Sequence, residues 1–309
     1  MKIAFVFPGQ GSQYLGMLDS WNNETINSVM LEASSILKQD LKSLISKGPL
    51  ESLNLTVNTQ PIMLAVCLSF FLVWRESGGR DPDIMAGHSL GEYTALAASG
   101  AISFSDCLRL VRYRAELMQS VIPADHSAMA AIIGIEQDDV VLICNRNSND
   151  VHIVEIANYN SPLQIVIAGH KDAVISSCKE AKALGAKRTI MLPVSAPFHS
   201  TILKPISKYL FYFLDSIDIK APKVDVINNV DVKIENDPVL IRDALVRQAW
   251  SPVRWVETVQ YMKMMGVTHI LEFGPGSVLS NLIKRIDPEL VTISIRDYNS
   301  LNKAIMLVN

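Results

Sequence analysis

The sequence predicts an α/β fold, in which a core with a parallel sheet carries a small inserted subdomain. Two observations lead to this prediction. Apolar segments typical of strands alternate with helical segments along most of the chain, and this rhythm changes between residues 125 and 194. The 309 residues are 49% hydrophobic, which is enough for a large buried core. The formal net charge of −3 argues against non-specific binding to nucleic acid or to an anionic membrane, and we expect neither partner.

The first part of the chain supplies two of the expected strands. Residues 2–7 form a continuous apolar run that ends at a Pro-Gly pair, typical of a strand buried on both faces of a parallel sheet. Helical patterns follow over residues 24–46 and 60–76. A short strand at 84–86 leads directly into the sequence GHSLG. The Ala-rich helix after it, from 92 to 98, ends at a Ser-Gly pair, where a C-terminal glycine is expected.

The middle of the chain predicts a ferredoxin-like β-α-β-β-α-β unit. Its expected strands and helices occupy, in order, residues 128–133, 137–146, 151–157, 164–168, 172–184 and 188–192. We therefore expect a small subdomain at 125–194, inserted into a larger α/β core made of 1–124 and 195–309. Three further strands of the core are expected at 224–227, 269–273 and 291–295.

Two features bear on the location of the protein. The most apolar stretch, residues 62–74, has thirteen residues, which is too short to span a bilayer. The four cysteines are widely spaced, as expected of single thiols in a reducing compartment rather than of a disulfide framework. The amino-terminal residues lack a cleavable signal pattern, and we expect a cytoplasmic protein.

Ser89 is the candidate nucleophile, because a strand, the sequence Gly-His-Ser-Leu-Gly and a helix follow one another. Glycines two residues before and after Ser89 permit a tight turn that presents the serine hydroxyl above the sheet. The amide of Leu90 would then lie at a helix N-terminus, where it favours a developing oxyanion. The alternative is a tight turn in which Ser89 merely caps the helix.

His199 is the candidate base among six histidines, because it lies in a proline-flanked loop where the chain returns from the subdomain. The alternative is a loop histidine that only hydrogen-bonds to the backbone. None of the aspartates between Ser89 and His199 has the post-strand setting of a hydrolase triad. A Ser–His dyad oriented by a group other than a carboxylate is therefore the favoured hypothesis.

Arg114 stands on the apolar face of its expected helix, residues 106–121. With Cys107 at zero and roughly 100° per residue, it falls at about 340°, in the centre of the apolar stripe. A buried guanidinium keeps its charge and requires an anion. One explanation is a structural salt bridge or a snorkelling stem. The other is a fork that grips a substrate carboxylate with two parallel hydrogen bonds.

Taken together, these residues resemble the malonyl-CoA:acyl carrier protein transacylases, over essentially the whole chain. Seven ordered motifs carry the resemblance: Phe7–Gln13 (FPGQGSQ), Gly87–Glu92 (GHSLGE), Arg114 with Met118-Gln119, Asn158–Pro162 (NYNSP), Ala196–Ser200 (APFHS), Val246–Gln248 (VRQ) and Glu272–Gly276 (EFGPG). The implied activity transfers malonyl from malonyl-CoA to the phosphopantetheine thiol of acyl carrier protein for fatty acid synthesis. The implied fold is an α/β-hydrolase-like core with a ferredoxin-like subdomain, the site lying in the cleft between them.

The resemblance also implies a role for each site residue. Ser89 would be the nucleophile and His199 its base. Backbone amides of Gln10 and Leu90 would form the oxyanion hole, although Gln10 also suits an ordinary Gly-rich loop.

Among the remaining implied roles, Arg114 would bind the malonyl carboxylate, with Met118, Phe198 and Asn160 near the substrate. The main-chain carbonyl of Gln248 would orient the imidazole. No metal and no resident cofactor are implied, since CoA and phosphopantetheine belong to the substrates.

Several alternatives remain open on sequence alone. A serine thioesterase or esterase would use water as the acceptor, and an acyltransferase of a polyketide pathway would share every motif. A monomer is expected. Because carrier proteins of this pathway are acidic, Lys187-Arg188 and Lys284-Arg285 are candidates for a basic docking rim. Ordinary solvated surface charge is the alternative for each pair.

Overall fold

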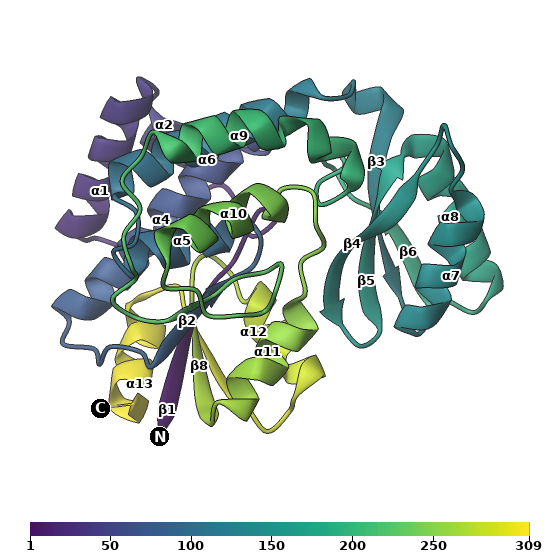
Figure 1. The fold of residues 1–309 in the computed structure, drawn as a ribbon. Helices are drawn as coiled ribbons and strands as arrows, with labels where there is room; N and C mark the ends of the chain where they lie inside the picture. Colours follow the sequence, from purple (N-terminus) through teal and green to yellow (C-terminus); the bar gives the residue numbers. More distant parts are fainter. Residues whose placement is uncertain (309) are drawn as a thin grey trace.

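The computed structural model describes residues 1–308 and contains two separate sheets (Figure 1). The larger is parallel, in the order β7 (Val226–Ile227), β2 (Ile84–Gly87), β1 (Lys2–Phe7), β8 (Val267–Phe273) and β9 (Val291–Ile295). The smaller is antiparallel, in the order β4 (Val154–Ser161), β5 (Gln164–His170), β3 (Ser127–Ile133) and β6 (Arg188–Met191). The predicted fold class is confirmed.

Strand β1 lies at the centre of the parallel sheet and is buried on both faces, as its continuous apolar run predicts. Ile3, Phe5 and Phe7 belong to the larger core cluster, on one face of the sheet. Ala4 and Val6 point to the other face and join a second cluster. This alternation is the two-residue period of a strand, and it lets helices cover both faces.

Helices cover both faces of the parallel sheet. The larger core cluster draws on α1 (Glu24–Leu37), α4 (Thr56–Glu76), α5 (Leu90–Ala98), α6 (Phe104–Ser120) and α13 (Tyr298–Val308). The second cluster draws on α11 (Trp255–Met264) and α12 (Val278–Ile286). The other helical segments are α2 (Leu41–Lys47), α3 (Leu50–Leu53), α7 (Gln137–Asn147), α8 (Lys171–Ala183), α9 (Ser207–Asp215), α10 (Pro238–Gln248) and two 3-10 turns, Ala124–His126 and Thr201–Ile206.

Two helices differ from their expected extent. The single helix expected at 24–46 is two helices, α1 and α2, because Lys38 adopts a left-handed conformation with φ of 52° and ends α1. Helix α4 begins at Thr56 and has 21 residues, so by length and composition it could cross a membrane. Within the structure, however, 89% of its most apolar window is buried, as expected of a core helix.

The small sheet forms a lobe beside the core, with α7 and α8 packed on its outer face (Figure 1). Its strand order is that of a ferredoxin-like unit. Ala128, Ala130 and Ile132 of β3 point to α7 and α8, whereas Met129 and Ala131 join the larger core cluster. All four strands fall within the expected 125–194 segment, while the exact domain boundaries stay a prediction.

The register of the parallel strands brings three loops together at their carboxyl ends. Phe7 pairs with Gly87, and Ala86 pairs with Ile227. The loops that follow β1, β2 and β7 therefore leave the sheet side by side, at the edge where open α/β sheets bind their ligands.

Candidate active site

Ser89 lies in a strained turn between β2 and α5, with φ of 53° and ψ of −108°. The two neighbouring glycines supply space rather than an unusual φ. A Cβ on Gly87 would lie 1.8 Å from the carbonyl carbon of Gly91, and one on Gly91 would lie 1.9 Å from the carbonyl oxygen of Phe7. The serine itself therefore carries the positive φ, a conformation uncommon for any residue with a side chain.

His199 contacts Ser89, and its tautomer follows from its partners. Its Nε2 lies 2.6 Å from the Ser89 Oγ. Its Nδ1 lies 2.9 Å from the carbonyl oxygen of Gln248 and 3.1 Å from that of Ser251. Because carbonyl oxygens only accept hydrogen bonds, Nδ1 carries the proton and Nε2 offers a lone pair to the serine hydroxyl. His199 also has a positive φ, of 61°.

The environment keeps the imidazole of His199 neutral. The side chain is buried, at 3% exposure. Burial and, to a smaller degree, the positive charge of Arg114 together lower the pKa of His199 to about 3. A neutral imidazole is the form that can accept a proton from Ser89.

Arg114 extends from α6 to the same serine and is 2% exposed. Its Nη1 donates to the Gln60 Oε1 at 2.8 Å, and its Nη2 donates to the Gln248 Oε1 at 2.9 Å. Nη2 also lies 3.4 Å from the Ser89 Oγ. The predicted position of Arg114 on the buried face of its helix is correct, and the guanidinium reaches the Ser89 hydroxyl.

The charge of Arg114 is not matched by a direct ion pair. Within residues 1–308 its polar partners are the neutral side chains of Gln60, Gln248 and Ser89, and its guanidinium carbon lies 5.1 Å from the centre of the Tyr93 ring. The Nε has no hydrogen-bond partner. The side-chain amide of Gln248 stands between Glu92 and Arg114, and the charge of Glu92 acts on the guanidinium without a direct hydrogen bond. The cation can therefore still take an incoming carboxylate.

Ser89, His199 and Arg114 share one cavity of about 110 Å³, which Gln10, Leu90 and Phe198 also line. The loop after β1 packs closely against the Ser89 turn. A Cβ on Gly9 would lie 2.6 Å from the His88 carbonyl oxygen and 3.7 Å from the Leu90 nitrogen. Gln10 and Leu90 both line the cavity of Ser89, and the role of their backbone amides as an oxyanion hole stays a prediction. Donors of this kind stabilise negative charge on a reacting carbonyl oxygen.

Met118 and Asn160, both predicted to lie near the substrate, contact other side chains of the site. Met118 is fully buried, and its sulfur lies 3.8 Å from the Gln60 Nε2, so it packs against a residue that holds Arg114. The Asn160 Oδ1 lies 2.8 Å from the His88 Nε2. Their contact with substrate stays a prediction.

Several residues of the site were not predicted from the sequence. Gln60 holds Arg114, the carbonyl of Ser251 joins that of Gln248 at His199, and Glu92 and Asn229 are buried beside the turn. Glu92 could have been found from the sequence, because an acid inside an otherwise apolar helix requires a buried partner. Asn229 carries none, since it follows a two-residue strand.

Known proteins are similar to this chain in sequence and in fold. The acyl transferase domain family matches residues 4–288. Malonyl CoA-acyl carrier protein transacylases of Salmonella typhimurium and Escherichia coli are each 44% identical, over 98% and 99% of this chain and 99% of their own lengths. The chain belongs to the malonyl CoA-acyl carrier protein transacylase family.

Solved structures of transacylases agree with this membership. An acyl-carrier-protein S-malonyltransferase from Burkholderia pseudomallei has 51% identity and a TM-score of 0.96, over 99% of this chain and all of that one. A malonyl-transacylase in complex with a type II PKS acyl-carrier protein has 44% identity and a TM-score of 0.97, with the same coverage. As a member of the transacylase family, the chain is an acyltransferase.

Proposed function

We propose that this enzyme transfers the malonyl group of malonyl-CoA to the phosphopantetheine thiol of an acyl carrier protein through a malonyl-serine intermediate. The observation that carries the proposal is the position of Arg114. A buried guanidinium without a carboxylate partner stands 3.4 Å from a serine hydroxyl that also contacts a neutral imidazole. An esterase for neutral acyl groups has no use for such a cation, whereas a carboxylate-bearing acyl group does.

In the first half-reaction, the Ser89 Oγ attacks the thioester carbonyl carbon while its proton passes to the His199 Nε2. The amides of Gln10 and Leu90 stabilise the oxyanion, each by about 2.7–4 kcal/mol in the transition state. The C–S bond then breaks, and the imidazolium returns the proton to the departing CoA sulfur. In the second half-reaction, the carrier's thiol gives its proton to His199 and attacks the carbonyl carbon of the malonyl-serine ester. The ester C–O bond to Ser89 then breaks, and the imidazolium returns the proton to the Ser89 Oγ.

Substrate binding also strengthens the base. The positive charge of Arg114 lowers the pKa of His199. A malonyl carboxylate on the guanidinium neutralises that charge, so the imidazole becomes more basic when the correct donor is bound. Selection of the donor and activation of the serine are thereby linked through one cation.

Intact mass spectrometry tests the covalent step. After mixing with malonyl-CoA, we expect the protein to gain the mass of one malonyl group, and the Ser89→Ala variant to gain nothing. An unmodified wild-type protein that nevertheless transfers malonyl would contradict the proposal. Double-reciprocal plots at several carrier concentrations should be parallel, as a ping-pong scheme requires.

The acceptor separates transfer from hydrolysis. A thioesterase would lose its acyl group to water at a rate independent of carrier protein. We expect the malonyl-enzyme to persist in buffer and to be consumed rapidly when carrier protein is added. Comparing fatty acid and polyketide carriers in this assay identifies the pathway; we propose fatty acid synthesis.

The surroundings proposed for the enzyme follow from its own residues. All four cysteines are buried and unpaired, which fits the reducing cytoplasm. One chain supplies the serine, the histidine and the arginine of the cavity, so a monomer would suffice. The mechanism uses side chains and backbone groups of this chain, and we propose no metal or resident cofactor.

A further inference from the structure

Asn229 hydrogen-bonds to the Ser89 turn on both sides of His88. Its Oδ1 accepts from the Ser89 backbone nitrogen at 2.7 Å, and its Nδ2 donates to the Gly87 carbonyl oxygen at 2.6 Å. The residue is fully buried. An asparagine amide is suited to this position because one side chain offers both an acceptor and a donor.

The turn needs such support because its conformation is strained. A positive φ at a residue other than glycine costs of order 1–3 kcal/mol and persists only where the surroundings hold it. Asn229 can reach the turn because Ala86 of β2 pairs with Ile227 of β7. Two residues beyond that pair, in the loops that follow the two neighbouring strands, lie His88 and Asn229.

Glu92 connects Asn229 to the rest of the site. Its Oε2 accepts from the Asn229 backbone nitrogen and from the Gln248 Nε2, both at 3.0 Å. The Gln248 Nε2 also donates to the Ser89 carbonyl oxygen at 2.7 Å. Because the Gln248 backbone carbonyl accepts from His199, one buried network joins the serine, its support and the base.

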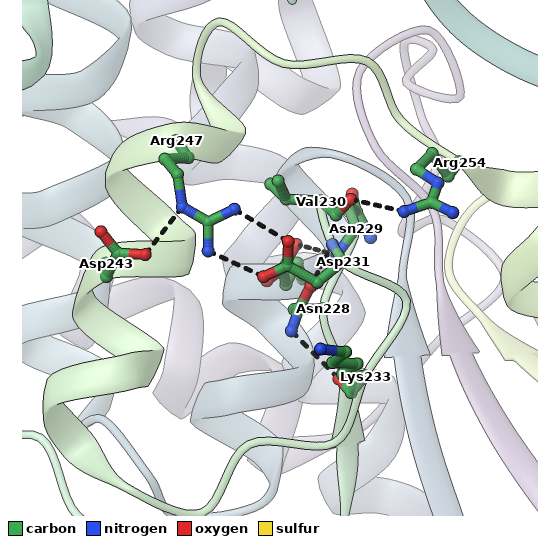
Figure 2. A network of polar contacts seen from close by, with 9 residues as sticks. Asn228, Asn229, Val230, Asp231, Lys233, Asp243, Arg247 and Arg254 are labelled. Carbon is green, nitrogen blue, oxygen red and sulfur yellow. Dashed lines mark hydrogen bonds and ion pairs between the residues drawn. The ribbon is translucent and has the colours of Figure 1, made fainter.

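Two arginines, Arg247 and Arg254, bind the loop that carries Asn229 (Figure 2). Arg247, on α10, makes a two-pronged ion pair with Asp231, with Nη1–Oδ1 at 2.9 Å and Nη2–Oδ2 at 2.7 Å. The Arg254 Nη1 donates to the Val230 carbonyl oxygen at 3.0 Å. The Nε of Arg247 contacts Asp243 of its own helix at 2.7 Å.

We propose that Asn229 is a positioning residue for the reaction, which holds Ser89 at the attack geometry, and that the Arg247–Asp231 ion pair keeps the Asn229 loop in place. The proposal rests on the malonyl-serine mechanism above. Within residues 1–308, Arg114, which binds the donor, hydrogen-bonds to Gln248 of this network and not to Asn229 itself. Loss of the support should therefore slow acylation without weakening donor binding.

The first test is Asn229→Ala, measured by rapid mixing with malonyl-CoA and mass detection of the malonyl-enzyme. We expect the acylation rate constant to fall about 10²-fold, as misplacement of a nucleophile by about 1 Å does. The malonyl-CoA concentration at half-saturation and the final amplitude should stay at wild-type values. An unchanged rate constant, or a loss of amplitude alone, overturns the proposal, because a purely structural role lowers only the amount of active protein.

The second test is a matched pair of variants at Arg247. Asp231→Asn removes the partner on the Asn229 loop, and Asp243→Asn removes the partner on α10. We expect acylation to slow about fivefold in Asp231→Asn at low salt and to stay unchanged in Asp243→Asn.

Equal rate constants in the two aspartate variants overturn the role of the Arg247–Asp231 ion pair. If Asn229→Ala does not fold, the two aspartate variants are the deciding test, and equal acylation rate constants in them overturn the whole proposal. A wild-type protein that forms no malonyl-enzyme would contradict the proposed function instead.

Discussion

At the scale of residues, burial sets the protonation state of two groups in the site, His199 and Glu92. His199 is neutral because it is buried and faces a cation, and its proton lies on Nδ1 because two carbonyls accept there. Glu92 is the opposite case, an acid whose pKa burial raises to about 7 even though Gln248 and Asn229 donate to it. Both groups give pH dependences that differ from those of ordinary residues.

We expect kcat/KM for malonyl-CoA to lack the acid limb of an ordinary histidine. The free enzyme loses its base only when His199 is protonated, and the pKa of His199 is about 3. We therefore expect kcat/KM to stay level from about pH 8 to about pH 5, because this whole range lies above the pKa of His199. A fall centred near 6.5 that persists in Glu92→Gln would contradict a buried, neutral His199.

Glu92 should reduce the stability of the protein as the pH rises. Its pKa is about 7 in the folded state against an ordinary 4.5, so between these values the folded state holds a proton that the unfolded state lacks. This contribution is complete below about pH 4.5 and is lost as the pH rises through about 7. The Glu92→Gln variant keeps an acceptor for Asn229 and Gln248.

The free energy of unfolding of the wild type, minus that of Glu92→Gln, is the quantity to measure, because His199 contributes equally to both proteins. It should fall between pH 5 and pH 8. A difference independent of pH would show that Glu92 is ionised throughout.

At the scale of elements, close contact between β1, β2 and α5 sets the Ser89 turn. A Cβ at Gly91 would lie 1.9 Å from the Phe7 carbonyl oxygen, which is backbone and cannot move aside. We expect Gly91→Ala to lower the free energy of unfolding by about 3 kcal/mol or more.

Gly185→Ala is the control for Gly91→Ala. A Cβ there meets nothing within 4 Å, and only the φ of +97° is unfavourable. Gly185→Ala should lower the free energy of unfolding by about 1 kcal/mol, as for other residues forced into a positive φ. Equal costs in denaturant titrations of both variants would show that the Gly91 contact relaxes easily.

Most elements were predictable because their patterns are local. The continuous apolar run of Lys2–Phe7 and the apolar stripe of Phe104–Ser120 can both be recognised from nearby residues in the sequence. The break at Lys38 was not predictable, since nothing in the periodicity of residues 24–46 marks a left-handed residue. Asn229 reaches Ser89 only through the pairing of β2 with β7, and such long-range registers cannot be derived from a short strand alone.

At the scale of the whole molecule, three of the four basic residues expected to meet the carrier line one groove, whereas Lys284 lines a different pocket. Lys187 and Arg188 of the small lobe and Arg285 of α12 line one groove, with Gln164 accepting from the Arg285 Nη1. The groove runs between the two lobes and can present positive charge to an acidic partner. Solvated surface charge remains the alternative for each residue alone.

Reversal of charge at Lys284 and Arg285 tests this surface. We expect Lys284→Glu with Arg285→Glu to raise KM for the carrier protein about tenfold at low salt, because electrostatic steering is lost. Acylation by malonyl-CoA alone should keep its rate constant. Unchanged carrier kinetics would remove this pair from the docking surface.

Donor selectivity in Arg114→Ala tests most directly whether a buried cation beside Ser89 chooses the substrate. The measurement is kcat/KM for malonyl-CoA and for acetyl-CoA in wild type and variant. We expect malonyl transfer to fall about 100-fold, corresponding to about 3 kcal/mol for an otherwise unpaired carboxylate, while acetyl transfer persists or improves. An equal loss for both donors would contradict the proposal that Arg114 binds the malonyl carboxylate.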